Sequence, residues 1–203
     1  MHKRNIQAMT ILETATRRKT ARIFKTDSVN KDAIEYILET ARQAPSGSNE
    51  QPWRFIIVSD PDQKQKIREA SEKGEQAFYE SISPEKKKGY NNKGLSPSKP
   101  LLTQAPVLIV VLGDTTAPNY KPSVWVSIAY AILAAEEKGL ATVTYTPSDP
   151  VLVTEAVGAP EDFLVESILP LGYSDDPKPK ENRLKLPELV FRDEWGTPLL
   201  IIE

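Results

Sequence analysis

The chain contains no cysteine. Disulfide bonds, thiolate nucleophiles and cysteine-ligated metal centres are therefore excluded together. Histidine is almost as scarce. The single histidine stands at position 2, in a segment that we expect to fray. A Ser-His-Asp hydrolase or a site with several histidine ligands is then nearly excluded, and we expect no metal site. If the protein is an enzyme, a bound cofactor should carry the chemistry.

Long apolar runs are also missing. The longest, near residues 107–112, has the length of a strand and falls far short of the roughly 20 residues that span a bilayer. Residues 1–5 are basic, but no apolar stretch follows, so we expect no secretory signal. The net charge is -2, without the clustered basic excess that is typical of nucleic-acid binding. These absences predict a cytoplasmic protein with no membrane or nucleic-acid partner.

The length and the apolar pattern favour one α+β domain. The 203 residues suit a single domain, residues 1–203, and 39% apolar residues are enough for a core. Helical spacing and capping residues predict helices at 8–18, 30–44, from 60 onwards, 122–138 and from 149 onwards. Strand-like runs lie at 54–58, 107–112, 141–146 and 164–171. This order predicts a layered α+β fold with a mixed sheet.

Residues 71–100 are open to two interpretations. The stretch 86–94, reading Lys-Lys-Lys-Gly-Tyr-Asn-Asn-Lys-Gly, is polar and is expected to be mobile. The simpler interpretation is a solvated loop. The alternative is a lid over a substrate cleft, since functional residues are often carried by loops.

The composition changes after residue 173. Asp, Pro and Lys dominate residues 174–185, which can bury little, so we expect an extended arm there. Apolar residues follow this polar stretch. They are Leu186, Leu189, Val190, Phe191, Trp195 and residues 199–202. A polar arm that ends in apolar anchors indicates docking, and we expect residues 174–203 to pack on a partner subunit.

The first chemical motif is a basic cluster at the end of the first helix, made of Arg18, Lys19, Thr20 and Arg22. A helix C-terminus favours cations, so a solvated basic turn explains the cluster by itself. The functional interpretation is a clamp for a phosphate, because guanidinium groups bind phosphate oxygens in a bidentate manner.

The second motif is the loop at residues 45–53. Pro, Ser, Gly and Asn are typical turn residues, so an ordinary helix-to-strand turn is one interpretation. However, Asn49 and Gln51 carry amides that both donate and accept hydrogen bonds, as does the pyrimidine edge of a flavin. Ser46 and Gly47 are small and allow the backbone to approach a flat ligand closely.

Together these segments resemble the nitroreductase family of FMN-dependent enzymes. Residues 18–24 match the family's Arg-Arg-Ser-x-Arg-x-Phe segment. Residues 44–55 match its Ala-Pro-Ser-x-x-Asn-x-Gln-Pro-Trp-x-Phe block, which is the most specific part. Residues 134–140 and 169–173 are similar to the end of the central helix and to the last strand. The resemblance extends over about residues 10–195. It implies a nitroreductase-like fold, in which helices flank a central mixed, mainly antiparallel sheet and the C-terminal arm is extended.

The resemblance also implies the cofactor-binding residues. Those for the FMN phosphate and ribityl chain are Arg18, Thr20, Arg22, Arg183 and, as a helper, Lys185. Lys19 would lie near the N1 and O2 edge of the flavin if it points inwards. The residues that reach the flavin from the other protomer are Pro45, Ser46, Gly47, Asn49 and Gln51. Those that line one face of the ring are Thr144, Tyr145 and Thr146.

Two departures from the family pattern concern the substrate side. The central helix reads Ile128-Ala129-Tyr130 where the family often has Gln-Asn. Residues 142–147, reading Thr-Val-Thr-Tyr-Thr-Pro, lack the Glu-Gly or Gly-rich form of many members. Both changes bear on the substrate class more than on FMN binding.

The implied activity is that of a homodimer with FMN at the subunit interface. NADH or NADPH would pass hydride to flavin N5 and leave, and an acceptor would then take the electrons at the same face. Our first expectation for this acceptor is a nitroaromatic, a quinone or a similar small molecule. The second is a specialised flavin reaction such as dehalogenation, enoyl-type reduction or flavin breakdown. The third is a non-catalytic flavin carrier or interaction module.

Overall fold

The computed structural model describes residues 9–199, so His2, Ala8 and the expected anchors at 200–202 lie outside the described residues. Its centre is a sheet with the strand order β1-β2-β4-β3. The strands are β1 (Trp53–Val58), β2 (Val107–Asp114), β3 (Ala141–Thr142) and β4 (Phe163–Gly172). All three strand pairs are antiparallel. A parallel contact comes from the isolated bridge between Thr20 and Thr142, which agrees with a mixed, mainly antiparallel sheet.

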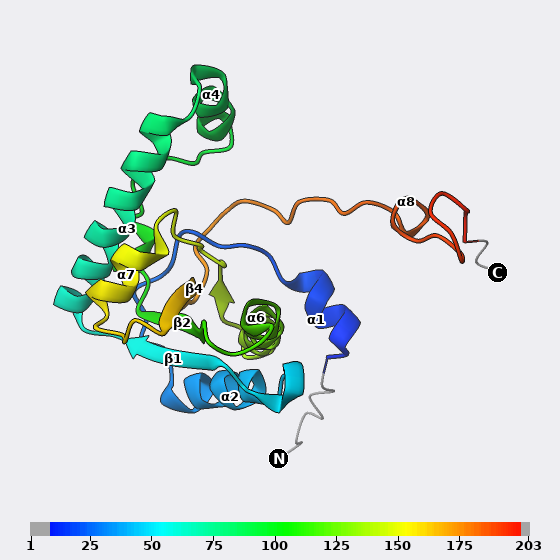
Figure 1. The fold of residues 1–203 in the computed structure, drawn as a ribbon, viewed down its shortest axis with the longest axis horizontal. Coiled ribbons are helices and arrows are strands. Elements are labelled where there is room, and N and C mark those ends of the chain that lie inside the picture. The colour runs from blue at the N-terminus through cyan, green and yellow to red at the C-terminus, as the bar shows by residue number, and fades with distance from the viewer. Residues whose placement is uncertain (1–8, 200–203) are drawn as a thin grey trace, which may run out of the picture.

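Helices cover both faces of this sheet, which confirms the α+β prediction (Figure 1). One face packs on α2 (Lys31–Arg42) and α6 (Tyr120–Glu137). The other packs on α3 (Pro61–Ser81), α5 (Leu101–Gln104) and α7 (Pro150–Ala156). Successive side chains of β2 point alternately into the apolar clusters on the two faces of the sheet. Because both faces are buried, the strand is one continuous apolar run.

The helix starts follow their capping residues. Thr10 and Glu13 form a capping box at α1 (Ile11–Arg17), and Asn30 and Asp60 cap α2 and α3. The central helix α6 begins two residues earlier than expected, at Tyr120. Pro122 therefore lies in the first turn, where its missing N–H costs no helical hydrogen bond.

The interpretation of residues 86–94 as a solvated loop was wrong. The chain there forms helix α4 (Pro84–Asn92), with Ser83 as its N-cap. Tyr90 holds α4 against the end of α3, because its ring lies 5.9 Å from Phe78 and 5.8 Å from Tyr79. The cap and the aromatic contacts outweigh the polar composition. Figure 1 shows α4 at the end of α3, beyond the sheet.

The strand expected at 141–146 is also shorter than predicted. The ladder includes residues 141 and 142 and then resumes as an isolated bridge between Tyr145 and Ile168. The side chains still alternate, since Tyr145 is buried whereas Thr144 and Thr146 are exposed. The alternation that predicted a strand therefore marks an extended segment that leaves the sheet edge.

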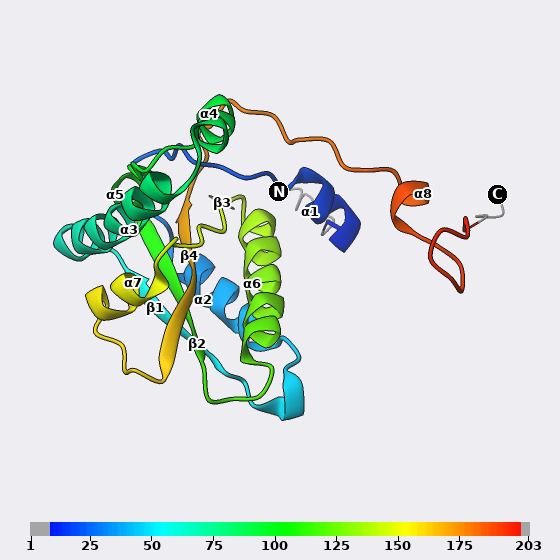
Figure 2. The ribbon, with the colours of Figure 1, turned by 45° about the horizontal axis from the view of Figure 1, so that its top comes forward.

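The C-terminal part is an extended arm, as expected. Residues 178–185 contain no helix or strand, and the short helix α8 (Leu186–Leu189) follows. The arm leaves the body of the molecule in both ribbon views (Figures 1 and 2). Leu184, Leu186 and Leu189 of the arm are exposed, and Trp195 is 90% exposed.

Candidate functional site

The basic cluster of residues 18–22 lies against the end of the sheet. The Ala21 N–H donates to the carbonyl oxygen of Thr142 at 3.1 Å, and Ala21 is completely buried. This contact fixes the backbone, so the side chains on either side of Ala21 have defined directions. A guanidinium N–H of Arg18 donates to Thr20 Oγ1 at 3.4 Å.

The start of the C-terminal arm is tied to this cluster through Asp176. This carboxylate is 7% exposed and accepts hydrogen bonds from the backbone N–H groups of Arg22 at 2.8 Å and Lys178 at 3.0 Å. Burial alone would raise the pKa of Asp176, but these two hydrogen bonds and the charges of Lys19 and Lys178 outweigh it, so the pKa is lowered.

Lys19 belongs to the same junction. Its ammonium donates to the carbonyl oxygens of Asp176 at 2.6 Å and Lys178 at 2.7 Å. The side chain therefore points at the arm in this chain. The position of Lys19 near the N1 and O2 edge of a flavin stays a prediction. If it holds, the carbonyl groups of Asp176 and Lys178 lie near that edge as well.

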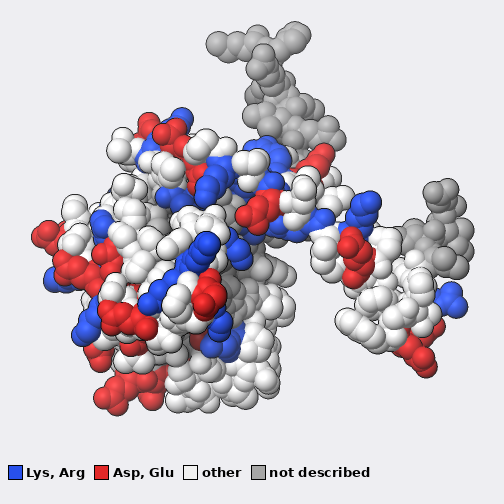
Figure 3. Space-filling view, turned by 90° about the horizontal axis from the view of Figure 1, so that it is seen from above, with Lys and Arg blue, Asp and Glu red and all other residues white. Residues whose placement is uncertain are grey.

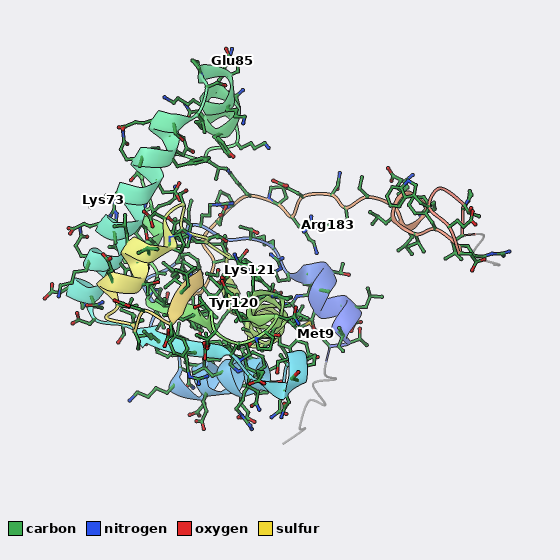
Figure 4. All side chains as sticks on the ribbon, in the orientation of Figure 1. Met9, Lys73, Glu85, Tyr120, Lys121 and Arg183 are labelled. Atoms are coloured by element: carbon green, nitrogen blue, oxygen red, sulfur yellow. The ribbon has the colours of Figure 1, made fainter. Side chains whose placement is uncertain are left out.

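Arg18 and Arg183 form a pair of like charges. Burial and then the charge of Arg183 lower the pKa of Arg18, whereas the charge of Glu136 acts in the opposite direction. The Arg183 side chain points from the arm towards α1 (Figure 4). Lysine and arginine side chains gather on the face from which the arm departs (Figure 3). Two guanidinium groups that repel each other favour an anion between them, as a phosphate-binding site requires. Lys185 lies beyond this junction, at the N-cap of α8.

A cavity of about 310 Å³ opens beside Arg22. Its walls come from three segments: residues 143–145, residues 94–101 without Pro97, and Arg22 itself. The expected residues Arg22, Thr144 and Tyr145 are thus brought together, whereas Thr146 is not among the lining residues. Of the stretch 86–94, only Gly94 is among the lining residues, and the lid stays a prediction.

A buried ion pair adjoins this cavity and was missed by the sequence reasoning. Lys99 Nζ lies 3.1 Å from Glu75 Oε2, and the side chains are 12% and 8% exposed. The Tyr145 hydroxyl donates to Glu75 Oε1 at 2.9 Å. The spacing of Ser71, Glu75 and Tyr79 could have indicated a buried polar site, because it places these three side chains on one face of α3.

The loop at 45–51 lies at a different end of the molecule. The Gly47 N–H donates to Ser123 Oγ at 3.2 Å, near the start of α6, and Gln51 N–H donates to Ser46 Oγ at 3.0 Å. Asn49 and Gln51 adopt positive φ angles of 58° and 48° and are exposed. Pro45 is also exposed. The loop is therefore held at Gly47 while its amide side chains face outwards.

The two motifs do not meet within one chain. Ser123 contacts the loop, whereas Glu136 pairs with Arg17 next to the basic cluster at 3.3 Å. Both lie on α6, and 13 residues of helix correspond to about 20 Å. Figure 2 shows the loop at one end of α6 and the basic cluster at the other.

The chain matches the family model described as "Nitroreductase family" over residues 15–173. It is 43% identical to an iodotyrosine deiodinase of Thermotoga neapolitana, over 85% of this chain and 93% of that protein. It is 34% identical to an iodotyrosine deiodinase of Haliscomenobacter hydrossis, over 87% of this chain and 82% of that protein. A crystal structure of oxidized iodotyrosine deiodinase bound to FMN and 3-iodo-L-tyrosine has a TM-score of 0.84 and 40% identity, and covers 91% of this chain and 99% of that chain.

Proposed function

Because the chain belongs to the nitroreductase family, we propose that it is an FMN-dependent reductive dehalogenase of halogenated tyrosines. This is the second of our expectations from sequence, and the relatives named above support it better than nitroaromatic or quinone reduction. In the proposed reaction two electrons and one proton replace iodine by hydrogen on the aromatic ring, and iodide leaves. NADH or NADPH would be the original electron donor.

The observation that carries the proposal is the buried pair of Glu75 and Lys99. An amino acid ligand brings both an ammonium and a carboxylate into its site. Lys99 lines the cavity and contacts Glu75. We propose that this ammonium and this carboxylate of the protein bind the two opposite charges of the ligand. A nitroaromatic or a quinone has no such pair of charges, and burying two ions for it would have no evident benefit.

The residues present fit a bound FMN. Arg18 and Arg183 would hold the phosphate with Thr20, and Arg22 and Thr144, which border the cavity, would lie against the ring. When bound, FMN supplies the electrons for breaking the carbon–iodine bond. The protein residues would hold the phosphate, orient the amino acid and exclude water from the cavity.

We further propose that the complete site requires a second copy of the chain. The loop at 45–51 and the basic cluster lie about 20 Å apart along α6. A two-fold partner whose α6 runs in the opposite direction would bring its loop beside the cluster. The outer surfaces of α6 and α1 are apolar enough for this contact, since Val126 and Tyr130 are exposed and Ile11 and Leu12 are 80% and 76% exposed.

The arm provides a second contact in this proposed dimer. An apolar cavity of about 660 Å³ lies between α2 and the edge strand β1 and is lined by residues including Ile34, Leu38 and Phe55. The arm carries exposed Leu184, Leu186 and Leu189 away from its own body. We propose that residues 184–195 of one protomer fill this cavity on its partner.

The test starts from the absorption spectrum of the purified protein, which should show bound flavin. Anaerobic reduction with dithionite and addition of 3-iodo-L-tyrosine should then release iodide and form tyrosine in equal amounts. Rapid oxidation of NADH or NADPH with nitrofurazone or menadione, without iodide release from iodotyrosine, would contradict the dehalogenase proposal and restore our first expectation.

A further inference from the structure

Tyr145 connects the edge of the cavity with the central sheet. Its backbone exchanges two hydrogen bonds with Ile168 of β4, at 3.0 and 2.8 Å, and Ser167 Oγ donates to its carbonyl oxygen at 3.2 Å. These contacts fix the position of the residue. The side chain, 9% exposed, points into the protein, opposite to the exposed neighbours Thr144 and Thr146.

The hydroxyl of Tyr145 contacts one oxygen of Glu75, and Lys99 contacts the other. The Tyr145 hydroxyl lies 2.9 Å from Oε1, and Lys99 Nζ lies 3.1 Å from Oε2. Each carboxylate oxygen has two acceptor sites, so Glu75 can still accept further hydrogen bonds. Burial and then the charge of Glu75 raise the pKa of Tyr145, which keeps the phenol protonated as a donor.

The backbone of α3 next to Glu75 is also held in place. Gly74, its neighbour in α3, lies so close to Asp149 that a Cβ would be 2.8 Å from the Asp149 Cβ. The backbone of α3 therefore has little freedom at this point, and the direction of the Glu75 side chain depends on its two partners. Without the Tyr145 hydroxyl, both carboxylate oxygens could turn to Lys99, and the two ions would satisfy each other.

We infer that Tyr145 is a positioning residue for amino acid ligands, whose hydroxyl holds the Glu75 carboxylate where it can accept hydrogen bonds from a ligand ammonium. Tyr145 thereby keeps the charges of Glu75 and Lys99 available to a zwitterion. This inference rests on the proposed function, because it assigns the amino acid group of the substrate to the cavity.

The variant Tyr145→Phe tests the inference, since it removes the hydroxyl and keeps the ring. We expect the KM for 3-iodo-L-tyrosine to rise about 10- to 100-fold, the scale of a hydrogen bond to a buried charge, with a much smaller change in kcat. The rise should be confined to ligands that carry the amino acid group, so 2-iodophenol is the comparison substrate. The FMN dissociation constant is measured in parallel.

Tyr36→Phe is the matched control. Tyr36 also donates its hydroxyl to a glutamate, Glu137 Oε2 at 2.8 Å, but on the surface and far from the cavity.

A double-mutant cycle gives a second measurement. Glu75→Gln should raise the KM for iodotyrosine, and adding Tyr145→Phe should raise it little further.

The outcomes separate this inference from the proposed function. If the wild type releases iodide and Tyr145→Phe has an unchanged KM, or loses FMN affinity in proportion, the inference fails alone. If the wild type releases no iodide but binds 3-iodo-L-tyrosine, the proposed reaction fails, and the dissociation constants of the two variants decide the inference in the same way. If the wild type binds no aromatic amino acid at all, both fail.

Discussion

Lys99 Nζ and Glu75 Oε2 lie 3.1 Å apart, and their side chains are 12% and 8% exposed. Removing one partner of a buried pair leaves the other charge without compensation, which is more costly than the pair itself is stabilising. The pair joins α3 to the segment before α5, and it lies beside the cavity. Its loss should therefore affect both the fold and the binding of a zwitterion.

Lys99→Met should lower the free energy of unfolding by about 3–5 kcal/mol, because Glu75 then stays buried without a counter-charge. The double variant Lys99→Met, Glu75→Gln should recover part of this loss. Urea denaturation measures both, with Lys73→Met on the exposed side of α3 as the control. Equal stability of Lys99→Met and Lys73→Met would show that the pair is not buried in solution.

Arg18→Ala should weaken FMN binding by about 1.5–3 kcal/mol, the scale of hydrogen bonds to a charged group. The apoprotein should lose little stability, because burial and the like charge of Arg183 both disfavour the charged form of Arg18. Arg42→Ala is the control, since Arg42 pairs with Glu39 on the surface. Flavin fluorescence titration gives both dissociation constants. A stability loss without a change in FMN affinity would mean that Arg18 has only a structural role.

Asp176 should make the junction between the arm and the basic cluster sensitive to acid. The folded protein lowers the pKa of Asp176 from its ordinary value of 3.8. Its contribution to stability is therefore complete above that ordinary value and is lost as the pH falls through the lower folded value. Unfolding measured between pH 5 and pH 2 should show a smaller loss in Asp176→Asn than in the wild type. Identical slopes would contradict the hydrogen-bonded carboxylate.

Two glycines inside helices should respond to alanine with opposite signs. A Cβ at Gly74 would lie 2.8 Å from Asp149 Cβ and 3.0 Å from its backbone nitrogen, whereas a Cβ at Gly89 has nothing within 4 Å. Gly74→Ala should cost about 1–3 kcal/mol of unfolding free energy. Gly89→Ala should gain roughly 0.5–1 kcal/mol through the higher helix propensity of alanine. Thermal unfolding distinguishes them, and a neutral Gly74→Ala would mean that α3 and α7 are not in close contact.

The proposed dimer depends on the uncovered apolar surfaces. Leu12→Glu together with Tyr130→Glu should produce a monomer, since each places a charge on the proposed contact. Light scattering coupled to gel filtration measures the mass. Val151→Glu is the control, because Val151 is 52% exposed on α7, away from α1 and α6. A wild type that is monomeric with FMN fully bound would rule out a site shared between two chains.

The sequence predicted the order of the elements well where caps and periodicity agree, as at Asn30 and Asp60. It failed for residues 86–94, because Ser83 and the contacts of Tyr90 with α3 outweigh a polar composition. The family motifs indicated Arg18, Arg22 and Arg183. They did not indicate Glu75 or Lys99, whose pairing depends on how α3 packs beside residues 94–101 and has no local signature.

No helix of residues 9–199 is long and apolar enough to cross a membrane. The departures noted at Ile128 and Tyr145 have clear structural consequences. Ile128 is buried in the apolar core between α6 and the sheet, and Tyr145 contacts Glu75.

The central claim is that this protein dehalogenates an aromatic amino acid and uses the charges of that amino acid to bind it. The most direct test compares iodide release from 3-iodo-L-tyrosine and from 2-iodophenol by the same flavin-loaded, reduced preparation. The account predicts a kcat/KM for the amino acid that is at least about 100-fold higher, since two charge-assisted contacts are lost with iodophenol. Equal values for both substrates, or no iodide from either, would contradict it.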